Sequence, residues 1–202
     1  ARFEWKELGI TLLDTPGHVD FSAEMERTLQ VLDYAILLVS GADGVQGHTE
    51  TLWKLLKRNN IPVFLFVNKM DQPGTDKEEL MENIKDRLSD NCIDFSGSRD
   101  EEFYESLAMC EEELLEQYLE TGEVSEEEIP HLITERKVFP VYFGSALKLD
   151  GVESFLDALL KYICEPAHEV RFGAKVFKIS RDDQGNRLTH LKVTGGSLKV
   201  KD

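Results

Sequence analysis

Three short polar clusters in this sequence follow apolar runs, and their side chains suit the binding of a phosphorylated nucleotide. They are D-T-P-G-H at residues 14–18, N-K-M-D at residues 68–71 and G-S-A-L-K at residues 144–148. Ligands of open α/β sheets bind at the carboxyl ends of the strands, where each cluster stands if the apolar runs are strands. Each cluster alone is a common turn sequence. Their order after successive apolar runs indicates one shared ligand site.

The first cluster carries groups suited to a metal ion and a phosphate. Asp14 at the end of a buried strand can hold Mg²⁺ through water, and Gly17 lets its backbone N–H approach a phosphate closely. The D-x-x-G pattern is common, so a simple strand-to-turn junction is the alternative interpretation.

The second cluster has the groups that distinguish guanine from adenine. The Asp71 carboxylate accepts hydrogen bonds only, and the edge of guanine presents a pair of N–H donors that adenine lacks. The aliphatic stem of Lys69 can cover the flat face of the base. Asn68 can tie the loop to its neighbours.

The third cluster is the weakest of the three signals. Its small residues let a backbone N–H reach a ligand carbonyl, and Ser145 is suited to brace the loop.

The elements that must position these clusters alternate between apolar runs and amphipathic helical stretches. Continuous apolar runs are typical of parallel strands with helices on both faces, and they occur at residues 10–13, 34–40, 62–68 and 138–143. The sequence therefore predicts an α/β fold with a mainly parallel sheet. Beyond residue 166 the pattern changes to alternation around R-D-D-Q-G-N-R, which predicts an antiparallel hairpin opening a second domain at residues 167–202.

The negative charge is concentrated in one stretch. The chain has a net charge of −16, and residues 76–135 hold 21 acidic and four basic side chains, whereas the remainder is nearly neutral. Apolar residues recur in this stretch at helical spacing, so we expect a folded helical insertion in the domain at residues 1–166. Its acidic face is either a solvated surface or a docking surface for a basic partner. The overall charge excludes general wrapping of nucleic acid.

Composition also restricts the class of protein. No apolar run reaches the roughly 18 residues of a membrane-spanning helix, and the three cysteines are too far apart for a disulfide framework or a structural zinc site. We expect a cytoplasmic protein that has neither a membrane nor DNA as a partner.

The three clusters resemble motifs of the translational GTPases. D-T-P-G-H, N-K-M-D and G-S-A-L are similar to the third, fourth and fifth guanine-nucleotide motifs of the elongation factor G group. Gln72 and the segments at residues 42–46 and 176–179 are most similar to those of the tetracycline-resistance ribosomal protection proteins. The acidic stretch lies where this group carries a subdomain, and the tail from Ala174 resembles the first strands of its β-barrel second domain.

The resemblance implies a function for the parent protein and roles for the clustered residues. The parent would hydrolyse GTP to GDP and phosphate on the ribosome, contacting ribosomal RNA and stalk proteins, either in translocation or in protection from tetracycline. At the phosphate end, Asp14 would hold Mg²⁺ through water, Gly17 would contact the γ-phosphate and His18 would orient the attacking water. The residues implied at the base are Asn68, Lys69, Asp71, Ser145, Ala146 and Leu147.

One element of the resemblance is absent from this sequence. The phosphate-binding loop G-x-x-x-x-G-K-[ST] does not occur in the 202 residues. We therefore expect a fragment of a longer factor that by itself neither binds GTP at micromolar concentration nor hydrolyses it. A missing strand would also leave unpaired sheet edges that recruit other chains. The alternative function is a nucleotide-independent binding module whose acidic stretch contacts a ribosomal partner.

Overall fold

The computed structural model describes residues 1–15, 27–165 and 170–199. The chain divides into two compact units. The larger contains residues 3–10 and 34–164, and the smaller contains residues 1–2, 11–33 and 165–202. Within the described residues, no helix has the length and apolar character needed to cross a membrane.

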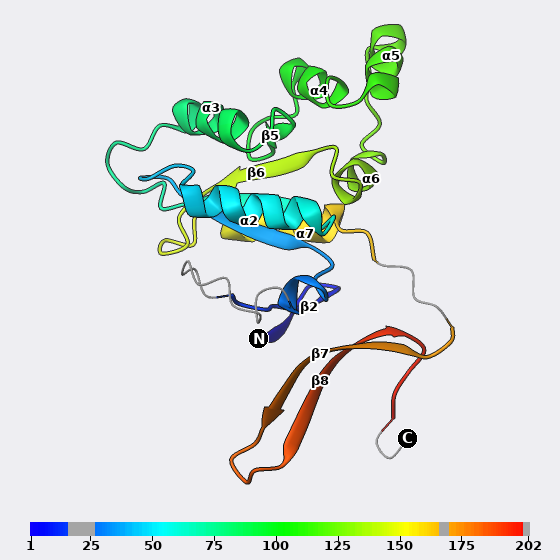
Figure 1. The fold of residues 1–202 in the computed structure, drawn as a ribbon. Helices are drawn as coiled ribbons and strands as arrows, with labels where there is room; N and C mark the ends of the chain where they lie inside the picture. Colours follow the sequence, from blue (N-terminus) through cyan, green and yellow to red (C-terminus); the bar gives the residue numbers. More distant parts are fainter. Residues whose placement is uncertain (16–26, 166–169, 200–202) are drawn as a thin grey trace. The chain divides into compact units, whose positions relative to one another are not determined.

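The larger unit is built on a four-stranded parallel sheet, whose order is β3-β4-β6-β5 (Figure 1). Its strands are β3 Ala35–Ser40, β4 Val63–Asn68, β5 Cys92–Asp94 and β6 Phe139–Phe143. The two central strands are almost completely buried, as their continuous apolar sequences predict for strands covered on both faces. The predicted α/β fold is confirmed.

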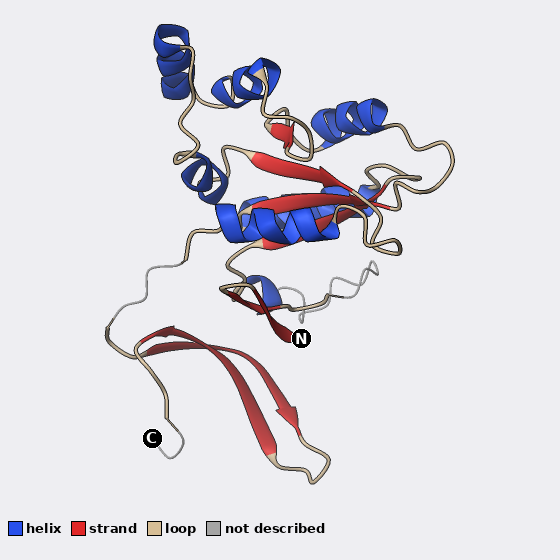
Figure 2. Ribbon diagram, turned by 180° about the vertical axis from the view of Figure 1, so that it is seen from behind, coloured by secondary structure: helices blue, strands red, loops and turns tan. Residues whose placement is uncertain are grey.

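Helices α2 Gly47–Arg58 and α7 Val152–Tyr162 cover opposite faces of this sheet (Figure 1, Figure 2). On one face, Trp53 of α2 packs edge-on against Phe139, with ring centroids 4.6 Å apart. On the other face, Phe155 of α7 packs against Tyr142 with a centroid separation of 5.2 Å. Because residues 139 and 142 point to opposite sides of the same strand, the two helices sandwich the sheet.

The acidic stretch at residues 76–135 is folded and mostly helical, as predicted. It forms α3 Lys77–Arg87, α4 Glu101–Ala108, α5 Glu112–Thr121 and α6 Ile129–Thr134. The stretch also contributes a strand that the sequence did not predict, because β5 lies within it and pairs in parallel with β6 at the edge of the main sheet. A strand of three residues is too short to give a readable period in the sequence.

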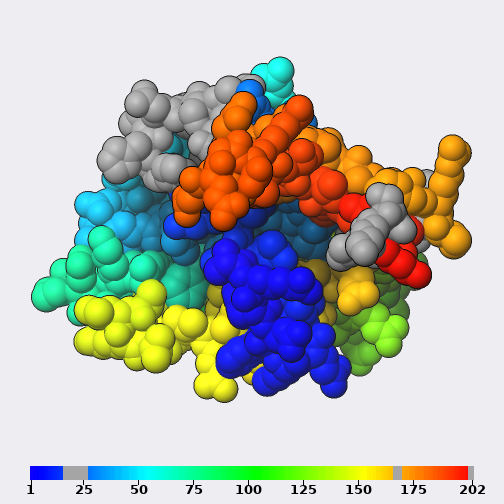
Figure 3. All heavy atoms as spheres, turned by 90° about the horizontal axis from the view of Figure 1, so that it is seen from below, coloured from blue at the N-terminus to red at the C-terminus, as the bar shows by residue number. Residues whose placement is uncertain are grey.

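The N-terminal residues also differ from the prediction. Instead of a buried strand of the main sheet at residues 10–13, the chain forms β1 Arg2–Trp5 and β2 Leu8–Thr11, which make a separate two-stranded sheet. The first residues of β1 are exposed and appear as dark blue spheres in Figure 3. Because only two residues connect β1 and β2, pairing them costs little loop-closure entropy.

The C-terminal alternation forms the predicted antiparallel hairpin. Strands β7 Gly173–Arg181 and β8 Arg187–Gly195 pair along their length, and the Asp182 carboxylate accepts hydrogen bonds from the backbone of Gln184 and Asn186 in the turn. Gly185 adopts a φ of 84°, which suits a residue without a Cβ.

Strand β3 lies at an edge of the main sheet and leaves apolar side chains uncovered. Leu38 is 62% exposed, whereas its neighbour Leu37 is 5% exposed on the opposite face. Because exposed apolar strands at sheet edges pair with other chains, we expect Leu38→Lys to reduce self-association in sedimentation velocity without lowering the melting temperature.

The matched control is Leu37→Lys, one residue away. It places an unpaired charge in the core and is expected to lower stability by roughly 3 kcal/mol or more. A wild-type chain that is monomeric, or self-association that persists in Leu38→Lys, would contradict this role of β3.

Candidate functional site

The candidate site begins where two neighbouring strands end. Val67 of β4 is in register with Phe143 of β6, so Asn68 and Gly144 leave the sheet side by side. The Gly144 N–H donates to the Val67 carbonyl at 2.9 Å, so the backbone pairing of the two strands continues one residue past Phe143. The second and third polar clusters of the sequence are therefore brought together.

The Asn68 side chain joins the two clusters. Its Oδ1 atom accepts hydrogen bonds from the backbone N–H of Lys69 and of Ala146, each at 2.8 Å. Lys69 has a φ of 66°, in the left-handed region that a non-glycine residue rarely adopts. The bond from its own N–H to Asn68 helps to hold that conformation, and the predicted tying role of Asn68 is seen in this geometry.

The loop after Asn68 is closed by further bonds to its surroundings. The Met70 N–H donates to the Gly144 carbonyl at 3.1 Å, and the Gln72 N–H donates to the Lys69 carbonyl at 3.1 Å. The Thr75 hydroxyl donates to the Met70 carbonyl at 3.0 Å. These bonds fix the backbone on either side of Asp71.

Asp71 is held as a carboxylate by its neighbours. A hydrogen bond from the Ser145 hydroxyl lowers the pKa of Asp71 below its ordinary value, and the ammonium of Lys148, 3.7 Å from Oδ2, lowers it further. The Asp71 side chain is 20% exposed, so it is both ionised and accessible. An ionised carboxylate accepts hydrogen bonds and donates none, which suits a ligand edge with N–H donors.

The loop after β6 is fixed by close backbone contacts. Ser145 and Asp150 exchange two backbone hydrogen bonds of 3.0 Å, and Ser145 is 2% exposed. A Cβ at Gly144 would lie 2.4 Å from the Asp150 carbonyl oxygen, so only glycine fits there. Ser145 therefore braces the loop from a buried position, as its residue type predicts.

The tip of this loop faces solvent. Leu147 is 89% exposed, and Ala146 is also exposed. The Ala146 N–H, which the sequence suggested for a ligand carbonyl, is already bonded to Asn68. Among the described residues, the Leu147 N–H makes no hydrogen bond, so it is the next donor available on this loop.

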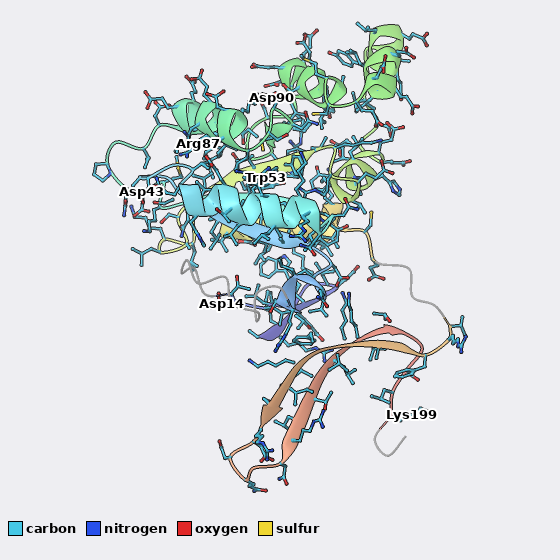
Figure 4. All side chains as sticks on the ribbon, in the orientation of Figure 1. Asp14, Asp43, Trp53, Arg87, Asp90 and Lys199 are labelled. Carbon is cyan, nitrogen blue, oxygen red and sulfur yellow. The ribbon has the colours of Figure 1, made fainter. Side chains whose placement is uncertain are left out.

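The first polar cluster is only partly described. Asp14, labelled in Figure 4, is exposed and follows β2, which is not a strand of the main sheet. Gly17 and His18 lie outside the described residues. Where the structure is described, no group of three or more histidine, cysteine or acidic residues is arranged to hold a metal ion.

Sequence reasoning missed three residues that shape this candidate site. Besides Thr75, Gly41 donates its N–H to the Asn68 carbonyl at 2.7 Å, and a Cβ at Gly41 would lie 2.9 Å from the sulfur of Met70. Lys148 was part of the third cluster but had no assigned role. A glycine directly after the apolar run at residues 34–40 is a signal that could have identified Gly41, whereas the contact of Lys148 depends on the sheet register.

Comparisons with known proteins agree on one family. The sequence profile described as the elongation factor Tu GTP binding domain matches residues 1–165. The tetracycline resistance protein TetW of Butyrivibrio fibrisolvens is 34% identical over 218 residues, which cover 99% of this chain and 34% of that protein. TetS of Listeria monocytogenes is 33% identical over 221 residues, with the same coverage of each chain. This chain thus spans about a third of the length of these curated relatives.

The fold is similar to that of a solved structure. A crystal structure of a protein from Thermus thermophilus superposes with a TM-score of 0.84 at 25% sequence identity, covering 100% of this chain and 38% of that one.

The bridge formed by Asn68 leads to a prediction about loop order. Asn68→Ala removes the acceptor of two backbone N–H groups, so we expect a loss of about 1 kcal/mol of stability in urea denaturation and faster hydrogen exchange at the Ala146 amide. Asn68→Asp retains an acceptor of similar size and should keep that amide protected. Unchanged exchange at Ala146 in Asn68→Ala would show that the bridge does not order the loop.

Proposed function

The chain belongs to the elongation factor Tu GTP-binding domain family, and on that premise we propose that it forms part of a ribosome-dependent GTPase acting in translation. In the complete protein this activity hydrolyses GTP to GDP and phosphate. The observation that carries the proposal is that the Asn68 side chain accepts hydrogen bonds from both loops. Beside it, Asp71 is ionised and is held by a hydrogen bond from Ser145. Between ribosomal protection and translocation we favour protection, because TetW and TetS are tetracycline resistance proteins.

The proposed base site uses the groups at the ends of β4 and β6. The Asp71 carboxylate accepts from the two N–H donors of the guanine edge, displacing the exposed ammonium of Lys148. The stem of Lys69 covers the face of the base, and Ser145 holds Asp71 in position. Since Asn68 occupies the Ala146 N–H, the Leu147 N–H is the donor that reaches the base carbonyl.

The proposed phosphate site uses Asp14, Gly17 and His18, and it rests on their resemblance to the family motif. Mg²⁺ keeps several water ligands and is commonly held by one carboxylate together with phosphate oxygens, so the exposed Asp14 fits a contact through water. When bound, Mg²⁺ neutralises phosphate charge. Gly17 approaches the γ-phosphate with its N–H, and His18 orients the attacking water.

The proposal extends to the partners and to the domain plan. Residues 1–166 would be part of the GTP-binding domain, and residues 167–202 would begin a β-barrel domain. The ribosome is the proposed partner, through ribosomal RNA near His18 and through stalk proteins, in the cytoplasm. The acidic helices of residues 76–135 would meet a basic surface, with binding that weakens as salt rises.

Exchange of the base-reading carboxylate tests the proposed ligand. In the full-length parent, Asp71→Asn replaces an acceptor-only group with one that also donates, so we expect a shift in preference from guanine toward xanthine nucleotides. GTP binding should weaken by about 2 kcal/mol, because a charge-assisted pair is lost. Calorimetry with GTP and XTP measures both effects.

The control is Glu78→Gln, which removes one exposed acid from the nearby helix α3. It should leave both affinities unchanged. Equal GTP affinity in Asp71→Asn and in the wild type would remove Asp71 from the site.

The role of His18 separates catalysis from binding. In the full-length parent, His18→Ala should leave GTP affinity nearly unchanged and lower ribosome-stimulated hydrolysis about 10²-fold, which is the scale of positioning and acid–base effects. His190→Ala, at a histidine on β8 outside the acidic stretch, is the matched control. Absence of any GTP turnover in the wild-type parent would favour the alternative of a nucleotide-independent binding module. Turnover at the wild-type rate in His18→Ala would show that His18 has no catalytic role.

A further inference from the structure

A separate cavity of the larger unit lies at the carboxyl ends of β5 and β6. It is on the face of the sheet that α7 covers; Figure 1 shows the positions of these three elements. Its volume is about 260 Å³, which is small for a nucleotide. The side chains that matter to its chemistry are Phe95, Arg99, Tyr142, Asp157, Lys161 and Tyr162. None of these residues belongs to the loops of the candidate guanine site.

The guanidinium of Arg99 is fixed in place by aromatic rings. Its central carbon lies 4.0 Å from the ring centroid of Phe103 and 4.6 Å from that of Phe95. Its Nη2 atom donates to the Tyr162 hydroxyl at 3.3 Å. A guanidinium held by two rings and a hydrogen bond loses little further entropy when it binds a ligand.

The other terminal nitrogen of Arg99 makes no hydrogen bond of good geometry, although the Tyr142 hydroxyl is a polar neighbour of the guanidinium. Nη1 is buried and has no hydrogen-bond partner among the described residues. A buried donor without a partner is costly, especially on a charged group, and such groups in native proteins commonly mark a missing ion, water or ligand.

The other charges around the cavity are already neutralised. Asp157 pairs with Lys6 at 2.5 Å, and Lys161 pairs with Glu126 at 2.5 Å. Within the described part of the chain, no carboxylate lies within 4.0 Å of the Arg99 guanidinium. Among the described residues, Arg99 is therefore the cation of this cavity that has no carboxylate in ion-pair contact, and Glu126, which is paired with Lys161, acts on it only at longer range.

We propose that this cavity binds a small monocarboxylate with an apolar body, whose carboxylate meets Arg99 and whose body packs against Tyr142 and Phe95. A carboxylate matches the planar donor geometry of a guanidinium. Arg99 belongs to a stretch with a net charge of −17, which repels a doubly charged phosphate more strongly than a singly charged carboxylate. The site is independent of the proposed GTPase function.

Benzoate is a suitable probe, and its neutral isostere benzamide is the matched control. The Trp5 indole N–H donates to Asp157 at 2.8 Å, so its NMR signal reports on the cavity. The indole of Trp53 lies on α2, against the opposite face of the sheet, and serves as an internal reference. We expect benzoate to shift the Trp5 signal with an affinity at least about tenfold above that of benzamide, because only benzoate gains a charge-assisted bond.

Variants locate the interaction at Arg99. Arg99→Gln should weaken benzoate binding about tenfold or more, whereas Arg58→Gln, an equal charge change on the exposed end of α2, should not. Circular dichroism and the melting temperature verify that each variant folds. If Arg99→Gln does not fold, the comparison of benzoate with benzamide on the wild-type chain tests the proposal.

Four results would overturn the proposal. They are equal binding of benzoate and benzamide, no saturable binding of benzoate at tens of millimolar, equal shifts at Trp5 and Trp53, and tighter binding of phenyl phosphate than of benzoate. Undiminished benzoate binding in a folded Arg99→Gln variant would also overturn it.

Discussion

The parallel pairing of β4 with β6 is the constraint on which the candidate site depends. Because Val67 and Phe143 are in register, the next residues of both strands emerge together, and one amide side chain can bond to both loops. Residues Val63–Val67 of β4 are buried on both faces, so a slip of one residue would move every side chain to the opposite face and disrupt its close packing. Packing thus fixes the register, and the register fixes the distance between the two polar clusters.

Backbone contacts in the loop after β6 add a second constraint. Gly151 has a φ of 72°, and a Cβ there would lie 2.6 Å from the Phe143 carbonyl oxygen. A Cβ at Gly144 would be equally crowded, so both glycines are needed for the loop to fold back against the end of β6. Because the loop folds back in this way, Ser145 is buried and its hydroxyl is directed toward Asp71.

The sequence predicted the parts of this arrangement that depend on local pattern. Strands β4 and β6 could be identified because burial on both faces requires a continuous apolar run, and Asn68 could be assigned a bridging role because its residue type follows such a run. The apolar run at residues 10–13 has the same pattern and was therefore predicted as a strand of the main sheet, but β2 pairs with β1 in a separate sheet. Three features depend on which strands are neighbours, and no local pattern encodes them: strand β5, the contact of Lys148 with Asp71, and the occupied N–H of Ala146.

The electrostatics of Asp71 connect these constraints to ligand binding under the proposed function. A hydrogen bond from Ser145 and the nearby Lys148 lower the pKa of the carboxyl, so it is ionised throughout the neutral range and takes up no proton when a ligand arrives. The Lys148 side chain is 62% exposed, and solvent weakens ion pairs of that kind. A base edge with two N–H donors would therefore exchange a screened contact for two charge-assisted bonds, while the bond from Ser145 keeps the acceptor in place. In the free chain this carboxylate is thus charged, held by Ser145 and only loosely paired with Lys148, so a ligand with two N–H donors could replace the Lys148 contact.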